Sequence, residues 1–253
     1  MRRLVQASLA IAVMLAAPAP TQVVAQDAFM PVDTALVLVV DASGSIVGRE
    51  FALQKEGIAQ AITDPEVMAA ILSGAEQRIA VAYVEWGSPR RPKTVVGWMI
   101  VEDEASAAAF AKAVLAAPRS PQSYNAIGDG IDHAAALLGQ CPCQPSRRVI
   151  DVSGDNPDNL SVRPAPEARD AAVAAGITIN ALAILEGDPI GPSGKPLLVE
   201  NYESEVIGGP GAFVMAAESR ADFARALRQK MVLEIADLGA RSPFVTARVG
   251  GPG

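Results

Sequence analysis

Apolar and polar positions along the chain form two alternating patterns. Six apolar segments predict strands, and the first is an unbroken apolar run, as in strands buried on both faces of a sheet. Between most of them, apolar residues recur at spacings of three and four, which predicts amphipathic helices. The strands are expected at 35–40, 78–86, 94–102, 147–155, 177–185 and 212–217. The helices are expected at 49–71 with a break at Asp64-Pro65, 105–117, 126–138, 165–176, 200–206 and 221–236.

The order of these elements predicts one doubly wound (Rossmann-like) α/β domain over 28–236. Strands that alternate with helices form a mainly parallel sheet with helices on both faces. The connection "GSPRRPK" between the second and third strands is short, so these strands form an antiparallel hairpin and one edge strand is antiparallel. The expected sheet has six strands, and no repeat or long linker indicates a second domain.

The two ends of the chain are expected to lie outside this domain. Arg2 and Arg3 precede a short apolar run, and small residues come before a plausible cleavage point at Gln26, as in a secretory signal peptide over 1–25. The alternative is an uncleaved membrane anchor, although the run is short for a bilayer span. We therefore expect an exported protein, periplasmic or secreted, with no membrane span after cleavage. Residues 237–253 are expected to form a flexible C-terminal tail.

Composition narrows the functional classes. The formal net charge is −7, and an acidic surface argues against binding to nucleic acid or to anionic membranes. Aromatic residues make up only 4%, so the core is expected to consist of Ala, Val, Ile and Leu. Cys141 and Cys143 share one loop, where an oxidising compartment permits a disulfide, although closing one across a single residue is strained. We expect a local feature of the loop, free or oxidised, without a role in the main function. The single histidine, His133, is expected to face solvent from a helix, and no G-x-S-x-G elbow accompanies it, which argues against a hydrolase triad.

One string carries the clearest chemistry. "DASGSI" places Asp41, Ser43 and Ser45 directly after the first buried strand. In an open parallel sheet, ligands bind beyond the carboxyl ends of the strands, where the strand order reverses. A carboxylate and two hydroxyls are hard oxygen ligands, so the string predicts a site for Mg²⁺ or a similar ion such as Mn²⁺ or Ca²⁺. The alternative is a degenerate site whose serines only cap the following helix.

With this motif the sequence resembles the von Willebrand factor A-type (vWA) superfamily, in which D-x-S-x-S opens the metal-ion-dependent adhesion site (MIDAS). The resemblance extends over 28–236 and includes the hairpin in the first half. It implies that an Asp after the fourth strand completes the site. In "VIDVSGD" this is Asp155, with Asp151 as a competing candidate inside the strand. The strings "RRVIDVSGD", "VEW" and "VIGGPGAFV" are similar to a bacterial branch of exported vWA proteins of unknown function.

The resemblance also implies a Thr ligand from a loop before a helix, and here the sequence departs from the family pattern. "NAIGDGI" aligns with T-x-x-G-D-A-[IL] and puts Asn125 in the Thr position. The side-chain carbonyl oxygen of Asn is still a hard ligand. Ser123, two residues earlier, is the alternative ligand, directly or through water. Trp86 near the same edge is expected either to form part of a partner-binding rim or to pack in the core.

These residues predict binding rather than catalysis. The predicted ligands of one divalent ion are Asp41, Ser43, Ser45, Asn125 and Asp155. As the vWA resemblance implies, the open coordination position of the ion would accept an Asp or Glu side chain of a protein partner, and we expect no enzymatic activity. One alternative is a Mg²⁺-dependent phosphohydrolase with Asp41 as nucleophile. Such enzymes commonly need a second Asp two residues later as acid–base, and the presence of Ser43 at that position argues against this alternative. The other is a structural module with a vestigial metal site.

Overall fold

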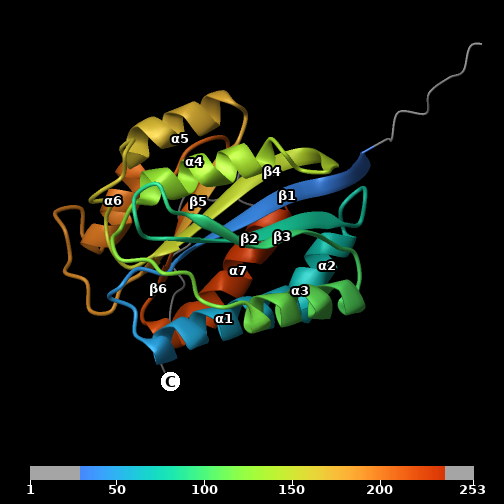
Figure 1. Ribbon diagram of the computed structural model, residues 1–253, viewed down its shortest axis with the longest axis horizontal. Coiled ribbons are helices and arrows are strands. Elements are labelled where there is room, and N and C mark those ends of the chain that lie inside the picture. The colour runs from blue at the N-terminus through green and yellow to red at the C-terminus, as the bar shows by residue number, and fades with distance from the viewer. Residues whose placement is uncertain (1–28, 237–253) are drawn as a thin grey trace, which may run out of the picture.

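A computed structural model describes residues 29–236 of the chain, and within them six strands form one sheet (Figure 1). The strand order is β3-β2-β1-β4-β5-β6, with β3 antiparallel to β2 and every other neighbouring pair parallel. The strands are β1 Met30–Asp41, β2 Ile79–Trp86, β3 Lys93–Val101, β4 Cys143–Gly154, β5 Thr178–Ile184 and β6 Val214–Ala217. The predicted fold is confirmed, whereas the predicted signal peptide, 1–25, and tail, 237–253, lie outside the described residues.

Helices cover both faces of the sheet, as predicted (Figure 1). One face carries α1 Gly48–Ile62, α2 Pro65–Leu72, α3 Glu104–Ala116 and α7 Phe223–Ile235. The other face carries α4 Ile127–Leu138, α5 Ala165–Ala174 and α6 Leu197–Glu205. The predicted break after α1 is present, because Asp64 accepts a hydrogen bond from Glu66 N at 2.8 Å and Pro65 begins α2. Among residues 29–236, no helix has the length and apolar character needed to cross a bilayer.

Burial explains why β1 is apolar almost throughout. The strand lies between two parallel neighbours and beneath helices on both faces, and its residues from Ala35 to Val40 are at most 2% exposed. Each fully buried aliphatic side chain of this kind stabilises the fold by about 1.5–3 kcal/mol. The central strands therefore form a rigid base for the loops at their carboxyl ends.

The chain order of the strands determines where a ligand site can form. From β1 the chain moves outward through β2 to β3, and then returns to the other side of β1 with β4. The order thus reverses between β1 and β4, and this switch point is where open α/β sheets bind ligands. Asp41 is the last residue of β1 and Asp155 directly follows β4, so the two carboxylates lie at the switch point.

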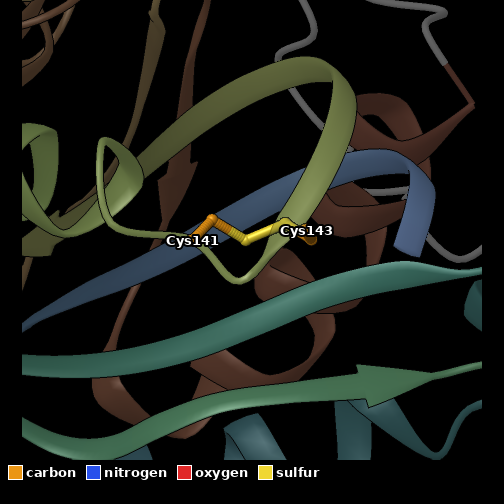
Figure 2. Close-up of a disulfide and its surroundings, with 2 residues drawn as sticks. All are labelled: Cys141 and Cys143. Atoms are coloured by element: carbon orange, nitrogen blue, oxygen red, sulfur yellow. A yellow bond between two sulfur atoms is a disulfide. The ribbon is translucent and has the colours of Figure 1, made fainter. Parts of the chain in front are cut away.

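The two cysteines form a disulfide in the connection between α4 and β4 (Figure 2). Cys143 begins β4, and its register partner is Met30 at the start of β1. The disulfide therefore lies at the amino ends of the central strands. This is the opposite edge of the sheet from Asp41, so Cys141 and Cys143 are local features of one loop, as the sequence indicated.

Several local details differ from the prediction. β1 begins at Met30 rather than Ala35, and β4 at Cys143 rather than near Arg147, because the main-chain pairing between these strands extends back to Met30 and Cys143. α6 begins at Leu197, three residues earlier than expected. His133 does not face solvent as expected. It is half-buried, with Nε2 2.8 Å from Thr94 Oγ1, and burial lowers its pKa.

Candidate metal centre

The loop after β1 gathers three oxygen-bearing side chains. Asp41 is fully buried, and its Oδ1 atom accepts a hydrogen bond from Ser43 N at 2.7 Å. The Asp41 Oδ2 atom is buried and has no hydrogen-bond partner among residues 29–236. Ser43 Oγ lies 3.1 Å from Ser45 Oγ, and Ser45 is exposed. One short loop therefore contains an unpartnered carboxylate oxygen and two neighbouring hydroxyls, of which the one on Ser43 is buried and the one on Ser45 exposed.

Asp155 brings a second carboxylate close to Asp41. Burial, and then the charge of Asp155, raise the pKa of Asp41 from its ordinary value to about 7. Two ionised carboxylates in a buried place repel each other unless a positive charge lies beside them. The two side chains thus have the electrostatic character of a cation site.

Asn125, in the position of the vWA Thr, comes from the loop before α4. Its Oδ1 atom is buried and, like Asp41 Oδ2, has no hydrogen-bond partner in the part of the chain that the structure describes. The backbone of Asn125 is fixed by Asn159, whose N–H donates to the Asn125 carbonyl at 2.9 Å and whose Oδ1 accepts from Asn125 N at 3.3 Å. Ser123 is exposed. An unpartnered buried oxygen favours Asn125 over Ser123 as the donor from this loop.

Gly87, directly after β2, allows the loop after β1 and the loop before α4 to meet. A Cβ atom at this position would lie 2.7 Å from Gln122 Cβ, 3.1 Å from the Tyr124 carbonyl oxygen and 3.3 Å from Ser43 Cα. The Gly87 carbonyl also accepts a hydrogen bond from Ala126 N at 2.9 Å. The absence of a side chain here therefore brings the two candidate ligand loops together.

Arg119, which the sequence analysis did not identify, holds the loop after β1 in place. Its guanidinium donates hydrogen bonds to the carbonyl oxygens of Ala42 at 2.9 Å, Ser43 at 2.7 Å and Ile46 at 2.8 Å. The guanidinium also lies over the Phe51 ring, 4.7 Å from its centroid. No sequence spacing connects Arg119 with this loop, because the contact depends on the path of the α3–α4 connection.

Arg220 is a second residue that the sequence analysis did not identify. It begins the 3₁₀ turn Arg220–Asp222 after β6, and its Nη2 atom donates to Asp155 Oδ2. Asn156 Nδ2 donates to the other oxygen, Asp155 Oδ1, at 2.6 Å. Both oxygens of Asp155 therefore have protein partners, whereas Asp41 has one on Oδ1 only, among the described residues. The available signal was topological, since β6 ends at the same edge of the sheet as β1 and β4.

Two residues considered for this edge have structural roles instead. Trp86 is fully buried and its Nε1 donates to the Val39 carbonyl at 3.2 Å, so its interpretation as part of an exposed rim is wrong. Asp151 is also fully buried, within β4, and lies 2.6 Å from the ammonium of Lys230. Asp151 therefore serves an ion pair in the core rather than the carboxyl edge.

The donor set fits a hard divalent cation. Within the described part of the chain, no three His, Cys, Asp or Glu side chains gather as a set that would hold a metal. The candidate centre instead combines two carboxylates with two hydroxyls and an amide oxygen. Mg²⁺ and similar ions prefer such oxygens and retain several waters, so a few protein ligands suffice. The unpartnered oxygens of Asp41 and Asn125 are the atoms that such an ion would satisfy.

Comparison with known sequences identifies a family. The sequence model of a family described as "Protein of unknown function (DUF1194)" matches residues 31–239. No curated protein matches the chain. The matched range contains all the candidate ligands, but the family description assigns no activity to them.

Solved structures share the fold at low sequence identity. Proximal thread matrix protein 1 from the mussel byssus aligns with a TM-score of 0.57 and 14% identity over 82% of this chain and 48% of its own. The pilus adhesin SpaC from Lactobacillus rhamnosus GG aligns with a TM-score of 0.56 and 18% identity, over 82% of this chain and 31% of its own. A von Willebrand factor type A protein from Catenulispora acidiphila aligns with a TM-score of 0.52 and 17% identity, over 81% of this chain and 43% of its own. The chain thus spans less than half the length of these proteins. Another structure of the mussel protein has a zinc-occupied MIDAS motif.

Proposed function

The chain belongs to the DUF1194 family and has a vWA fold, and from this premise we propose that it is an exported, non-enzymatic binding protein. It would hold one divalent ion, Mg²⁺ or in its place Mn²⁺ or Ca²⁺, and through that ion engage an Asp or Glu side chain of a protein partner. The proposed ligands are Asp41, Ser43, Ser45, Asn125 and Asp155.

The observation that carries the proposal is the presence of two buried oxygens without partners, Asp41 Oδ2 and Asn125 Oδ1. A buried polar atom left without a partner costs about 1–3 kcal/mol, and native proteins keep few of them. These two come from loops that Gly87 brings into contact. A cation between the loops would satisfy both oxygens, which supports the proposed ligand set.

Each side chain has a distinct part in this function. Asp41 supplies an anionic oxygen, and the hydrogen bond from Ser43 N orients it. The hydroxyls of Ser43 and Ser45 supply neutral oxygens on the solvent side. Asp155, directly after β4, adds negative charge, and in the structure its oxygens accept from Asn156 and Arg220. A bound divalent ion supplies concentrated positive charge and an exchangeable position that a partner's carboxylate can take.

Exposed apolar side chains at the same edge support a protein as the partner. Three loops, after β1, before α4 and after β4, contribute both candidate ligands and large exposed apolar residues. These are Val47, Tyr124, Leu160 and Val162. Apolar groups that gather around a polar centre are typical of protein-binding surfaces. The partner's acidic residue is therefore expected to have apolar neighbours.

The metal part of the proposal is tested by titrating Mn²⁺ into the purified protein in a calorimeter. The wild type is expected to bind one equivalent, and Asp41→Ala is expected to bind none, because it loses the unpartnered anionic oxygen. Asp170→Ala is the matched control, since Asp170 has a side chain 70% exposed and pairs only with its neighbour Arg169. Equal binding by wild type and Asp41→Ala would refute the assignment.

The partner part is tested by a pull-down from the exported fraction of the native cells, in Mg²⁺ and in chelator. A protein retained by the wild type in Mg²⁺, but not in chelator and not by Asp41→Ala, is the expected result. Retention that is the same under all three conditions would mean that capture does not use the metal centre.

Export itself is tested by the N-terminal sequence of the mature protein. The pattern over 1–25 predicts that the mature chain begins at Gln26 and is recovered outside the cytoplasm. SpaC, one of the proteins with the same fold, is a pilus adhesin, which is consistent with such a location. A cytoplasmic chain that retains Arg2 and Arg3 would contradict the prediction.

A further inference from the structure

Arg220 lies where a single side chain meets three acidic residues. Its side chain is 9% exposed, and its Nη2 atom pairs with Asp155, whose side chain is also 9% exposed. Its Nε atom lies 3.5 Å from Glu50 Oε2 and 3.7 Å from Glu186 Oε1. The backbone N–H of Arg220 donates to Glu186 Oε1 at 3.0 Å, which fixes the start of the turn. The guanidinium thus contacts one candidate ligand closely and two other carboxylates at longer range.

The contacts of Arg220 leave one donor unused. The Nη1 atom is buried and has no hydrogen-bond partner within the described residues, although each guanidinium N–H is a strong donor. Asp155, by contrast, has partners on both oxygens, Arg220 on one and Asn156 on the other. The guanidinium of Arg220 therefore pairs with Asp155 although one of the donors of Arg220 is left unused.

A guanidinium and a divalent cation make competing demands on Asp155. Both draw on the same carboxylate charge, and two positive charges at a few ångströms repel each other. A carboxylate already paired with Arg is a weaker site for a metal. Conversely, a metal close to Asp155 lowers the free energy gained from the Arg220 pair.

We propose that Arg220 is an internal counter-cation that competes with the divalent ion for Asp155 and so determines the metal affinity of the centre. When an ion binds, the guanidinium moves its pairing toward Glu50 and Glu186, which already lie within 4 Å of it. This inference rests on the proposed metal-binding function and adds a residue that tunes it.

The opposite role for Arg220 makes the opposite prediction. If the guanidinium only oriented Asp155 for the metal, removing it would weaken metal binding. If it competes with the metal, removing it strengthens metal binding. The sign of one change in affinity therefore separates the two roles.

The test compares Mn²⁺ affinity, measured by calorimetry, in wild type, Arg220→Gln, Arg220→Lys and Arg225→Gln. Arg220→Gln keeps a hydrogen-bond donor but removes the charge, and it is expected to bind Mn²⁺ about tenfold more tightly or better. Arg220→Lys keeps the charge and is expected to stay close to wild type. Arg225→Gln, which loses a charge paired with Asp222 in the same segment, is the control for net charge and is expected to leave the affinity unchanged.

A second readout is thermal denaturation with and without Mn²⁺. Without metal, Arg220→Gln is expected to melt below wild type, because Asp155 loses the positive charge paired with it. With Mn²⁺ its melting temperature should rise more than that of wild type, because a ligand that binds the folded state stabilises it in proportion to its affinity. Should Arg220→Gln be unfolded without metal, Mn²⁺ should restore its fold, and failure to do so would count against the proposal.

The outcomes separate this inference from the function on which it rests. Asp41-dependent Mn²⁺ binding by wild type, with equal or weaker binding by Arg220→Gln, would overturn the competition and keep the metal centre. Binding by Arg220→Gln alone, abolished when Asp41→Ala is added, would support both. No Mn²⁺ binding by any of the proteins would overturn both.

Discussion

The core of the protein contains a pair of buried carboxylates that share one buried lysine side chain. Asp151 of β4 and Glu234 of α7 both pair with Lys230, whose side chain is fully buried between them. Asn180 of β5 also donates to Glu234, at 2.8 Å. Burial and the charge of Asp151 raise the pKa of Glu234 to about 8, and the ammonium of Lys230 opposes that rise. This group connects α7 to the sheet through a cation that the protein itself supplies.

The carboxyl edge contains a second pair of carboxylates with a different balance of charge. Arg220 pairs with Asp155 and, at longer range, with Glu50 and Glu186, while burial and the charge of Asp155 raise the pKa of Asp41 to about 7. The lesson of the comparison is that buried acids alone do not mark a binding site. Lys230 contacts both carboxylates of the core pair, whereas Arg220 pairs with Asp155 of the edge pair. The edge pair also lies at the switch point of the sheet, close to the exposed Ser45.

The largest expected effect comes from removing the cation of the core pair. Lys230→Met leaves Asp151 and Glu234 buried with no positive charge, so it should lower the free energy of unfolding by about 3–5 kcal/mol. Urea denaturation measures the change, and Lys112→Met, at an exposed lysine of α3, is the control. A loss as small as that of the control would mean that the core pair does not need Lys230.

The next largest effect is expected from adding a methyl group where the ligand loops meet. Gly87→Ala would place Cβ against Ser43, Gln122 and Tyr124, so the loops must move apart. We expect a stability loss of about 1–3 kcal/mol together with a marked loss of Mn²⁺ affinity. Gly97→Ala in β3 is the control, because its Cβ meets nothing within 4 Å. Unchanged metal binding by Gly87→Ala would show that contact between these loops is not required.

A smaller effect, of opposite sign, is expected from Asp41→Asn in metal-free protein. The folded-state pKa of Asp41 is raised from 3.8 to about 7, so the folded protein holds a proton that the unfolded chain releases. The contribution of this proton to the free energy of unfolding is therefore fully present below pH 3.8 and is lost as pH rises to about 7. At about pH 8 the Asn variant should be more stable than wild type by about 1 kcal/mol or more, and the difference should vanish in acid.

Urea denaturation at several pH values in chelator measures this difference, with Asp170→Asn as the exposed control. Calorimetry of Asp41→Asn should show that Mn²⁺ binding is lost although stability has risen. A variant less stable than wild type at about pH 8 would indicate that the Asp41 charge is already neutralised in the metal-free protein.

The smallest effect distinguishes the two candidate donors of the loop before α4. Asn125→Ala removes the unpartnered amide oxygen and should weaken Mn²⁺ binding several-fold, whereas Ser123→Ala should leave it unchanged. Asn125→Thr, which restores the residue of the vWA pattern, should bind at least as well as wild type. If Ser123→Ala is the weaker binder, Ser123 is the donor.

The sequence predicted the fold because its information is local. The apolar run of β1 and the Asp64-Pro65 break are read directly from neighbouring residues, and the short link after β2 predicts the antiparallel strand. The start of β4 was missed because pairing with the distant Met30 extends the strand.

The candidate centre was predictable only in part, for the same reason. Asp41, Ser43 and Ser45 form one local motif, and Asp155 and Asn125 were assigned through the vWA resemblance. Arg119 and Arg220 were not found, since each reaches the centre from a segment far away in the chain. Their roles depend on the tertiary path of the loops, which no spacing rule encodes.

The central claim is that oxygens from separate loops surround one cation at the switch point of the sheet. Its most direct test is a crystal structure of the protein grown in Mn²⁺, with an anomalous difference map calculated at the manganese absorption edge. The account predicts one strong peak at coordination distance, about 2.0–2.6 Å, from Asp41 Oδ2 and the hydroxyls of Ser43 and Ser45. A map with no peak there, or with its strongest peak elsewhere on the protein, would contradict it.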